Sequence, residues 1–175
     1  TVRAFQSRSF GAGDLVHNTF SYHLTPAGAM VESAALAIGC PVIPAGVGNT
    51  EQQLRTIADL RPAAYVGTPS FLKILLDRAA EQGIDLGCVQ KAMVGAEAFP
   101  SVLRTEFQGK GIKALQCYGT ADLGLIAYES FAPDGSVCEG MVLDEGVIVE
   151  LVHPGTGDPV PPGEVGEVVV TTLNP

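Results

Sequence analysis

Hydrophobic and polar positions follow two alternating patterns over the first 118 residues of the chain. Short apolar runs typical of buried strands are separated by longer segments in which apolar residues recur every three or four positions. The apolar runs predict strands at residues 15–20, 42–43, 63–66, 91–94 and 112–117, and the longer segments predict helices at residues 26–38, 50–61, 69–82 and 100–108. Strands that alternate with helices are typical of an α/β fold with a parallel sheet flanked by helices.

Several predicted helices have recognisable signals at their ends. Thr68 followed by Pro69 is typical of an N-cap with proline at the first helical position. Thr50 and Gln53 have the spacing of a capping box, and Gly83 is expected to close the helix that begins at Pro69. The helix at residues 26–38 is rich in alanine and glycine, so we expect it to be buried and to approach neighbouring backbone closely.

The pattern changes after Gly119. The remaining apolar runs lack helical segments between them and predict strands at residues 123–128, 147–152 and 167–172. We therefore expect two parts of one domain, an α/β part at residues 1–129 and a smaller β-rich extension at residues 130–175. Neither end of the chain resembles a natural terminus, so we expect the domain to be truncated at both ends.

Composition and charge narrow the range of partners. Hydrophobic residues make up 46% of the chain and charged residues 17%, which argues against disorder. The formal net charge is −9, and an acidic surface repels phosphate backbones, so we expect no nucleic-acid partner. No apolar run is long enough to span a bilayer, and we expect no membrane association.

The four cysteines, Cys40, Cys88, Cys117 and Cys138, form no C-x-x-C pair. Their spacing matches no zinc pattern, and no cysteine groups with a histidine at metal-ligand spacing. The sequence therefore predicts free thiols, a reducing cytoplasmic compartment and no zinc site.

Residue types suited to ligand binding follow four of the predicted strands. Ligands in open α/β sheets bind beyond the carboxyl ends of the strands. Glycines there let a flat ligand approach the backbone, a tyrosine offers a stacking face, and a carboxylate can hold a hydroxyl or a metal ion. Each end alone is also explained as an ordinary strand-to-helix turn, but four in series favour one shared cleft. The four ends are residues 22–23, 68–70, 95–97 and 118–119.

The order and spacing of several short segments resemble the phenylacetate–CoA ligases, a branch of the adenylate-forming, AMP-binding enzymes. Gly95-Ala96-Glu97 resembles a Gly-Ala-Glu segment of that family, and residues 118–122 resemble its adenine-binding motif, Tyr-Gly-x-Ser/Thr-Glu. The resemblance covers nearly the whole chain. Its other segments are residues 13–17, 39–45, 50–53, 59–62, 68–70 and 154–172.

The resemblance implies a fold and a reaction. The chain would form the central part of the large N-terminal domain of an adenylate-forming enzyme. Such enzymes use ATP and Mg²⁺ to convert a small carboxylic acid, here expected to be aromatic or related, into an acyl adenylate and pyrophosphate. Coenzyme A then attacks the adenylate to give a thioester.

The resemblance also assigns roles to residues. Tyr118 would stack on adenine, and Asp122 would be a catalytic residue near the magnesium ion. Gly119 and Thr120 belong to the same nucleotide-binding motif. Gly95, Ala96 and Glu97 would flank the adenine and acyl sites. The acyl pocket would draw on Tyr22, His23, Pro26, Ala27, Gly67 and Ala96.

Two positions depart from the family's pattern. Ala121 replaces a serine or threonine whose hydroxyl would contact the α-phosphate, and Asp122 is one methylene shorter than the usual glutamate. Other interpretations stay open for the motif: Tyr118 as a core tyrosine, and Asp122 as a solvated turn or helix-cap carboxylate. His17, inside a predicted strand, is expected to be a structural, hydrogen-bonded residue.

Two other functions remain open from the sequence. Some relatives adenylate a different acceptor, such as a deazaflavin coenzyme, and a non-catalytic nucleotide-binding domain would explain Ala121 and Asp122. For both enzymatic functions, the acid–CoA ligase and the enzyme with a different acceptor, the resemblance implies that the 175-residue chain alone is inactive. The family's phosphate loop, ribose-binding acid and catalytic lysine would all lie outside it. Truncated ends are expected to expose apolar sheet surface, which favours self-association, so a homodimer is a further expectation.

Overall fold

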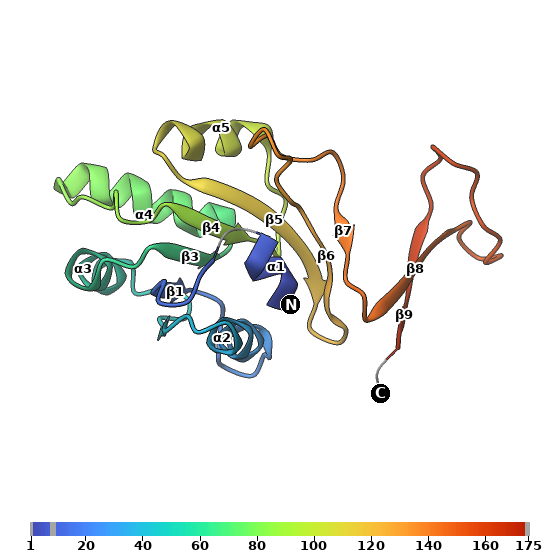
Figure 1. The fold of residues 1–175 in the computed structure, drawn as a ribbon, viewed down its shortest axis with the longest axis horizontal. Helices are drawn as coiled ribbons and strands as arrows, with labels where there is room; N and C mark the ends of the chain where they lie inside the picture. The colour runs from blue at the N-terminus through green and yellow to red at the C-terminus, as the bar shows by residue number, and fades with distance from the viewer. Residues whose placement is uncertain (1, 8–9, 174–175) are drawn as a thin grey trace.

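A computed structural model of the protein describes residues 2–7 and 10–173 (Figure 1). None of the helices formed by these residues is both long and apolar enough to cross a bilayer. The elements in chain order are α1 (Val2–Ser7), β1 (Val16–Asn18), α2 (Ala27–Ala37), β2 (Val42–Pro44), α3 (Thr50–Leu60), β3 (Ala64–Gly67), α4 (Pro69–Gln82), β4 (Lys91–Val94), α5 (Ser101–Gly109), β5 (Lys113–Thr120), β6 (Gly124–Tyr128), β7 (Val142–Leu143), β8 (Val147–Val152) and β9 (Glu167–Thr172).

The strands form a large mixed sheet and a separate hairpin. The large sheet has the order β2-β1-β3-β4-β5-β6-β7, in which β1 to β5 pair in parallel and β6 and β7 are antiparallel. Strands β8 and β9 pair antiparallel as a two-stranded sheet. The predicted α/β fold is confirmed, and the predicted strands and helices lie close to the observed ones. Two short elements, α1 and β7, were not predicted. The proposed boundary after residue 129 stays a prediction.

Two hydrophobic clusters cover opposite faces of the large sheet. Alternate residues of a strand point to opposite faces, and β3 and β4 show this directly. Tyr65 and Val94 pack into a cluster with α3, α4 and α5, whereas Val66 and Met93 pack into a second cluster with α1 and α2. Helix α2 is buried on one face only, since Leu36 on its other face is 56% exposed. The central strands are therefore fixed from both sides.

One predicted helix signal is confirmed and another is wrong. The Thr68 hydroxyl accepts a hydrogen bond from the Phe71 backbone N–H at 3.3 Å, with Pro69 at the first helical position of α4. The capping box at α3 is absent, because Asn49 occupies the N-cap without a side-chain hydrogen bond. Gln53 is buried instead, and its side chain binds another partner.

That partner is His17, a residue of β1 that is fully buried. The Gln53 amide donates to the carbonyls of Gly46 at 2.9 Å and Gly48 at 2.7 Å. Its oxygen therefore accepts from His17 Nε2, 2.8 Å away. His17 Nδ1 is buried with no hydrogen-bond partner among the described residues. Burial lowers the pKa of His17, and the bond to Gln53 only partly opposes that shift. The predicted structural role of His17 is thus supported by its contacts.

We expect the buried His17 to make stability depend on pH. Its folded pKa lies below the ordinary value of 6.5, so below that pH the unfolded chain takes up a proton that the folded chain rejects. The stability is fully present above pH 6.5 and is lost as the pH falls toward the folded pKa, with a slope of at most about 1.4 kcal/mol per pH unit. Urea unfolding of the wild type and of His17→Gln between pH 7 and 5 measures this slope.

The matched control for this measurement is His23→Gln, because His23 is an exposed loop histidine. The carboxylates titrate alike in all three proteins, so only the difference between their slopes reports on one histidine. Equal pH slopes for the wild type and His17→Gln would contradict the assignment of a buried, neutral imidazole.

A partly buried ion pair joins α5 to strands β5 and β6. The Arg104 guanidinium contacts both carboxylate oxygens of Glu129, at 2.8 and 3.1 Å, and donates to the Ala114 carbonyl at 3.2 Å. Glu129 also accepts the Gln116 backbone N–H at 2.6 Å, and Arg104 lies 4.4 Å from the centre of the Phe99 ring. These contacts fix β5 at the point where its pairing changes from parallel to antiparallel.

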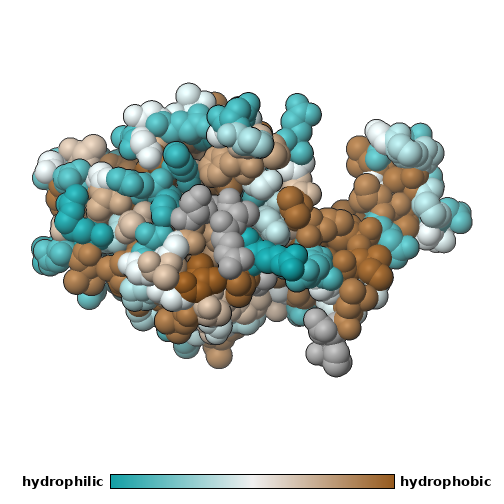
Figure 2. Space-filling model, viewed as in Figure 1, coloured by the Kyte–Doolittle hydropathy of each residue, from teal (hydrophilic) through white to brown (hydrophobic). Residues whose placement is uncertain are grey.

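The β8–β9 hairpin extends from the main body of the fold (Figure 1). Apolar side chains of both strands are exposed, including Ile148 at 49% and Val168 at 45% (Figure 2). A two-stranded hairpin alone is at best marginally stable in water. The predicted exposure of apolar surface toward the end of the chain is therefore seen as far as residue 173, and residues 174–175 lie outside the described ranges. The homodimer stays a prediction.

Candidate active site at the carboxyl edge of the sheet

The carboxyl ends of β3 and β4 lie side by side, as the parallel order requires. The Gly95 backbone N–H donates to the Gly67 carbonyl at 3.1 Å, so the ladder continues to the first residue after β4. The segments that directly follow these two strands, residues 68–70 and 95–97, are both predicted from the sequence to belong to the site. The two segments are in direct contact through Glu97.

Glu97 holds the first turn of α4. Its carboxylate accepts the Ser70 backbone N–H at 2.6 Å, and its own carbonyl accepts the Gln116 side-chain amide at 3.2 Å. A carboxylate near a helix N-terminus is favoured by the helix dipole. Glu97 therefore ties the ends of three neighbouring strands together, which fixes the backbone of residues 95–97.

Ala96 adopts a backbone conformation that is rare for residues other than glycine. Its φ is +65°, in the left-handed region. Gly95 before it is buried against β5, since a Cβ there would lie 2.8 Å from Cys117 Sγ. The surrounding contacts thus hold this segment in a strained shape, and such strain is concentrated at functional sites.

The predicted nucleotide motif lies in a hairpin, not in a strand-to-helix turn. Strand β5 continues to Thr120 and pairs antiparallel with β6, with a register shift between Tyr118 and Gly119. A Cβ on Gly119 would lie 2.5 Å from the Gly124 carbonyl oxygen, so only glycine lets the strands approach this closely. The Thr120 hydroxyl accepts the Leu123 backbone N–H at 3.1 Å and stabilises the turn.

Asp122 occupies the tip of this hairpin. Its side chain is exposed and makes no hydrogen bond or ion pair with any residue in the described ranges. The helix-cap alternative for Asp122 finds no support, because no helix among the described residues begins at this turn and Thr120 makes its side-chain contact. An exposed carboxylate in a turn agrees with the solvated-turn alternative, which stays open beside a role in metal binding. A free carboxylate at this position is available to an external ligand.

An apolar pocket of about 280 Å³ lies between α2 and the β5–β6 hairpin. No charged side chain lines it within the described part of the chain. Its polar groups are the threonines, Thr25 and Thr120. The remaining lining residues are Phe20, Ala27, Met30, Val31, Met93, Ala96, Cys117, Gly119, Ala121, Gly124 and Leu125. Such a pocket suits a small apolar group, and its edge is formed by the predicted nucleotide motif.

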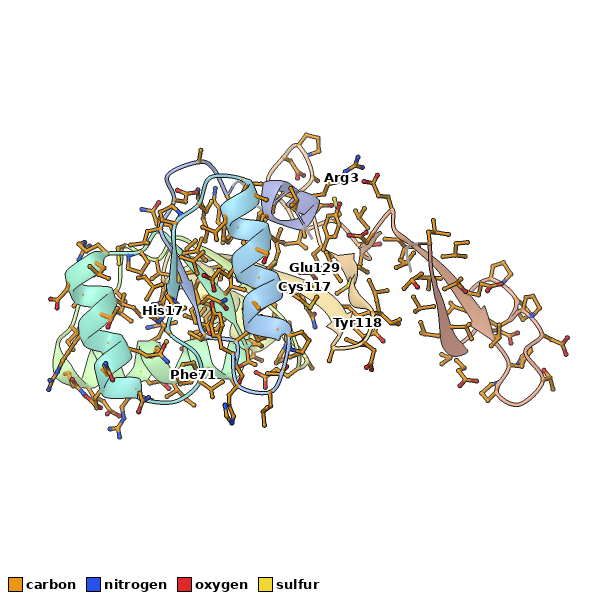
Figure 3. The ribbon with its side chains drawn as sticks, turned by 90° about the horizontal axis from the view of Figure 1, so that it is seen from below. Arg3, His17, Phe71, Cys117, Tyr118 and Glu129 are labelled. Carbon is orange, nitrogen blue, oxygen red and sulfur yellow. The ribbon has the colours of Figure 1, made fainter. Side chains whose placement is uncertain are left out.

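Tyr118 lies outside this pocket, on the other face of β5. Its neighbour Cys117 lines the pocket, and successive residues of a strand face opposite sides (Figure 3). Tyr118 shares its face with Gln116, which contacts Glu97. The Tyr118 side chain is 45% exposed, so the alternative of a core tyrosine is wrong.

The structure brings together only part of the predicted acyl pocket. Ala27 and Ala96 line the apolar pocket, whereas Tyr22, His23, Pro26 and Gly67 do not. His23 and Pro26 are exposed. Roles for these four residues in acid binding stay predictions.

Contacts within the fold explain the presence of two of these four residues, Tyr22 and Gly67. The Tyr22 hydroxyl accepts a hydrogen bond from the Asn18 amide at 2.8 Å, and burial together with Glu32 raises the Tyr22 pKa to about 12. Gly67 is buried, and a Cβ at this position would meet the hydroxyl oxygens of Thr19 and Tyr65. Glycine at position 67 is therefore explained by packing.

The apolar walls of the pocket were not predicted from the sequence. Met93 and Leu125 belong to predicted strands, and Met30 and Val31 to a predicted helix. Their positions in those elements do not distinguish a residue that lines a pocket from one that packs only in the core. The available signal was the alternation in β4, which places Met93 on the opposite face from Val94.

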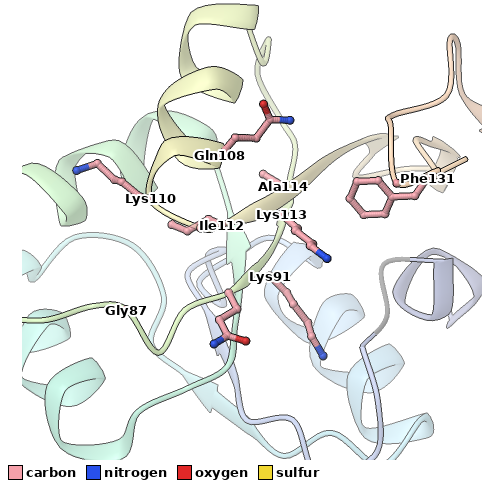
Figure 4. Close-up of a pocket in the computed structure, with 11 residues that line it drawn as sticks. Gly87, Lys91, Gln108, Lys110, Ile112, Lys113, Ala114 and Phe131 are labelled. Atoms are coloured by element: carbon pink, nitrogen blue, oxygen red, sulfur yellow. The ribbon is translucent and has the colours of Figure 1, made fainter. Parts of the chain in front are cut away.

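A larger pocket, of about 670 Å³, lies at the opposite edge of the sheet (Figure 4). Strands β4 and β5 begin at Lys91 and Lys113, and both residues line it together with Lys110. Lys91 also forms an ion pair with Asp14 at 2.6 Å. None of the residues that the sequence predicts for the site lines this pocket. We therefore place the candidate active site at the carboxyl edge despite its smaller volume.

Metal-binding groups are sparse in the described ranges. No three side chains of histidine, cysteine, aspartate or glutamate there come together to hold a metal ion. All four cysteines are free thiols, as predicted. A role for Asp122 in holding a magnesium ion stays a prediction.

Comparison with known proteins identifies the family. Residues 2–174 match the AMP-binding enzyme family. The chain belongs to the AMP-binding enzymes. A phenylacetate-coenzyme A ligase from Aromatoleum evansii is 33% identical over 99% of this chain, and one from Pseudomonas putida is 31% identical over 99%. In both comparisons the chain spans about 40% of the length of the curated relative.

Solved structures of AMP-binding enzymes share the fold of this chain. A 2-hydroxyisobutyryl-CoA ligase, in the postadenylation state in complex with 2-HIB-AMP, superposes with a TM-score of 0.86. The match covers 98% of this chain and 38% of that chain, at 21% sequence identity. The chain therefore has the fold of part of this CoA ligase, as the sequence predicts.

Proposed function

We propose that the full-length protein containing this chain activates a small carboxylic acid with ATP. The carboxylate oxygen of the acid attacks the α-phosphorus of ATP, the bond to the β-phosphate oxygen breaks, and pyrophosphate leaves. In the second step the sulfur of coenzyme A attacks the acyl carbonyl carbon, and AMP leaves. The similarity to phenylacetate-coenzyme A ligases supports an aromatic acid as the substrate.

One observation carries the proposal: the apolar pocket and the nucleotide motif share a border. Gly119 and Thr120 line the edge of the pocket and also belong to the hairpin with Asp122 at its tip. An apolar acyl group in the pocket would therefore present its carboxylate beside residues that face the nucleotide. Reactions of this type depend on holding both reactants in a near-attack geometry.

Residues 95–97 would position the two substrates. Ala96 lines the acyl pocket, while Glu97 contacts the first turn of α4 and, through its carbonyl, Gln116 on the face of β5 that carries Tyr118. We propose that adenine lies over this backbone segment and against the Tyr118 ring. The glycine at position 95 keeps the backbone close to β5, so the segment cannot shift away from the ligand.

Asp122 suits a magnesium ion that bridges nucleotide phosphates. Magnesium prefers oxygen ligands and is often held by one or two carboxylates together with phosphate oxygens. The exposed Asp122 carboxylate has no competing partner in the described ranges, so it fits this role. When bound, the ion would neutralise charge on the departing pyrophosphate. The protein's own contribution is to hold the carboxylate at the tip of a tight hairpin.

We expect Tyr118→Ala to weaken ATP binding by roughly 1–3 kcal/mol, by analogy with nucleic-acid bases stacked on aromatic side chains. Binding of the acid should change much less, because Tyr118 lies on the face of β5 away from the apolar pocket. Calorimetric titrations of the full-length protein with ATP and with the acid, done separately, measure both affinities. Tyr118→Phe keeps the stacking face and serves as the control. Equal losses in both affinities would contradict a specific contact with adenine.

Two assays test the two half-reactions. Acid-dependent exchange of pyrophosphate into ATP reports the adenylation step. Release of a thioester that depends on coenzyme A reports the second step. Exchange without thioester release would favour a different acceptor, such as a deazaflavin coenzyme, and would refute only the second half of the proposal.

A further inference from the structure

We propose that Met30 is the wall that sets the largest acid the apolar pocket accepts. This inference deepens the proposed function, because it takes the apolar pocket as the acyl site. It concerns which residue limits the size of the acid, which neither the family match nor the names of the relatives specify.

Met30 separates two neighbouring cavities. It lines the apolar pocket of about 280 Å³, and it also lines an open hollow of about 480 Å³ on an adjacent face of α2, next to Val2 of α1. Met30 is the single residue common to both linings within the described ranges. The other residues of the hollow are Val2, Pro26, Ala29, Ser33 and Ala34. The side chain of Met30 thus stands where an enlarged pocket would open.

The tip of Met30 reaches across to the β5–β6 hairpin. A Cβ built on Gly124 would lie 3.1 Å from Met30 Cε, so the methyl group is close to the first residue of β6. Gly124 has a φ of +76°, in the left-handed region, and directly follows the turn of the β5–β6 hairpin, so Met30 contacts the hairpin beside its turn. Met30 therefore bridges α2 and the hairpin, the two elements that border the pocket.

A second methionine in the pocket wall, Met93, has less room to move than Met30. Met93 on β4 is 2% exposed and packs within the core cluster beneath α1 and α2, so its side chain cannot move without disturbing the sheet. Met30 is half-buried on a surface helix, and methionine has three rotatable bonds and adapts its shape readily. Pocket size is consequently controlled from the α2 side.

The chemistry of the pocket defines the ligand class. Its walls are aliphatic, aromatic and sulfur-containing side chains, without a charged group in the described ranges. The matching ligand is an acid whose apolar group fills the pocket and contacts Met30. An acid longer than the pocket would meet the Met30 thioether.

The test compares acids of increasing length in the wild type and in Met30→Ala. Phenylacetate, 3-phenylpropanoate and 4-phenylbutanoate are assayed for ATP–pyrophosphate exchange and, independently, for binding by calorimetry. One methylene in an apolar pocket changes discrimination about 10–200-fold. We therefore expect Met30→Ala to raise the ratio of kcat/KM for the longest acid over phenylacetate at least about tenfold, and to shift the ratio of binding constants the same way.

Two variants make the result specific. Met30→Phe fills the same position with a larger, stiffer side chain and should shift the preference toward shorter acids. Met141→Ala removes an exposed methionine outside the pocket and should leave the preference unchanged.

The outcomes separate this inference from the proposed function. An unchanged length preference in Met30→Ala, with wild-type exchange intact, would overturn the inference and leave the proposed function standing. Absence of exchange with every acid, together with a length-dependent change in acid binding, would refute adenylation but support Met30 as the wall. Absence of acid binding by the wild type would overturn both.

Discussion

Asp122→Asn is expected to lower the rate of acid-dependent ATP–pyrophosphate exchange by about 10²–10³-fold. Removing one preorganised electrostatic group from a catalytic site typically has an effect of this size. The substitution removes a negative charge and keeps the shape of the side chain. Because Asp122 is exposed and contacts no other residue in the described ranges, the fold loses nothing when its charge is removed.

The measurement needs the full-length protein and a matched aspartate. Asp59 is exposed near the end of α3, far along the chain from the hairpin, and Asp59→Asn should exchange at the wild-type rate. Thermal unfolding of all three proteins should give closely similar midpoints. Near-normal exchange by Asp122→Asn would show that the carboxylate is only a turn residue.

A second large effect is expected from Gly67→Ala, which should lower the free energy of unfolding by about 3 kcal/mol. Overpacking of a close-packed core usually costs about 1–3 kcal/mol, and this site lies at the upper end. The added methyl group would meet the hydroxyl oxygens of both Thr19 and Tyr65 and lie 2.8 Å from Tyr65 Cζ. Thr19 and Tyr65 are hydrogen-bonded to each other at 2.9 Å, and Tyr65 donates to the Thr68 carbonyl at 3.0 Å.

Gly109→Ala provides the control for this prediction. Nothing lies within 4 Å of a Cβ at Gly109, the last residue of α5, so alanine there should be neutral or slightly stabilising. Denaturant unfolding compares the two variants. If Gly67→Ala is as stable as the wild type but binds the acid weakly, Gly67 belongs to the acyl pocket as the sequence predicted. A loss of stability supports the packing role that its contacts indicate.

Much of the fold could be predicted because local patterns and global packing agree. The short apolar runs at β3 and β4 are buried on both faces, so nearly every residue there had to be apolar. Thr68 and Pro69 marked the start of α4 correctly, since the capping contact involves only neighbouring residues. Gln53 was misread for the opposite reason: its partner, His17, lies 36 residues away and could not be inferred from local spacing.

The motifs of the candidate site could be singled out from the sequence, but the walls of the apolar pocket could not. Residues 95–97 and 118–122 were singled out by their resemblance to segments of the family and by glycine, tyrosine and carboxylate groups at predicted strand ends, and their roles in binding stay predictions. Two consecutive strands were predicted here, at residues 112–117 and 123–128, but not that the first continues to Thr120. That extension depends on the Thr120 side chain in the turn and on the close approach of Gly119 to Gly124. The positions of Met30 and Met93 in the pocket depend on how α2 lies over the sheet, which no local pattern specifies.

Acid-dependent ATP–pyrophosphate exchange by the full-length protein is the most direct test of the proposed function. The assay uses a panel of aryl and short aliphatic acids, with nucleotide binding measured in parallel. We expect exchange that requires both magnesium and an acid, is fastest with a small aryl acid, and is reduced about 10²–10³-fold in Asp122→Asn. Intact nucleotide binding with no acid-dependent exchange for any acid would contradict the proposal and identify a non-catalytic nucleotide-binding domain.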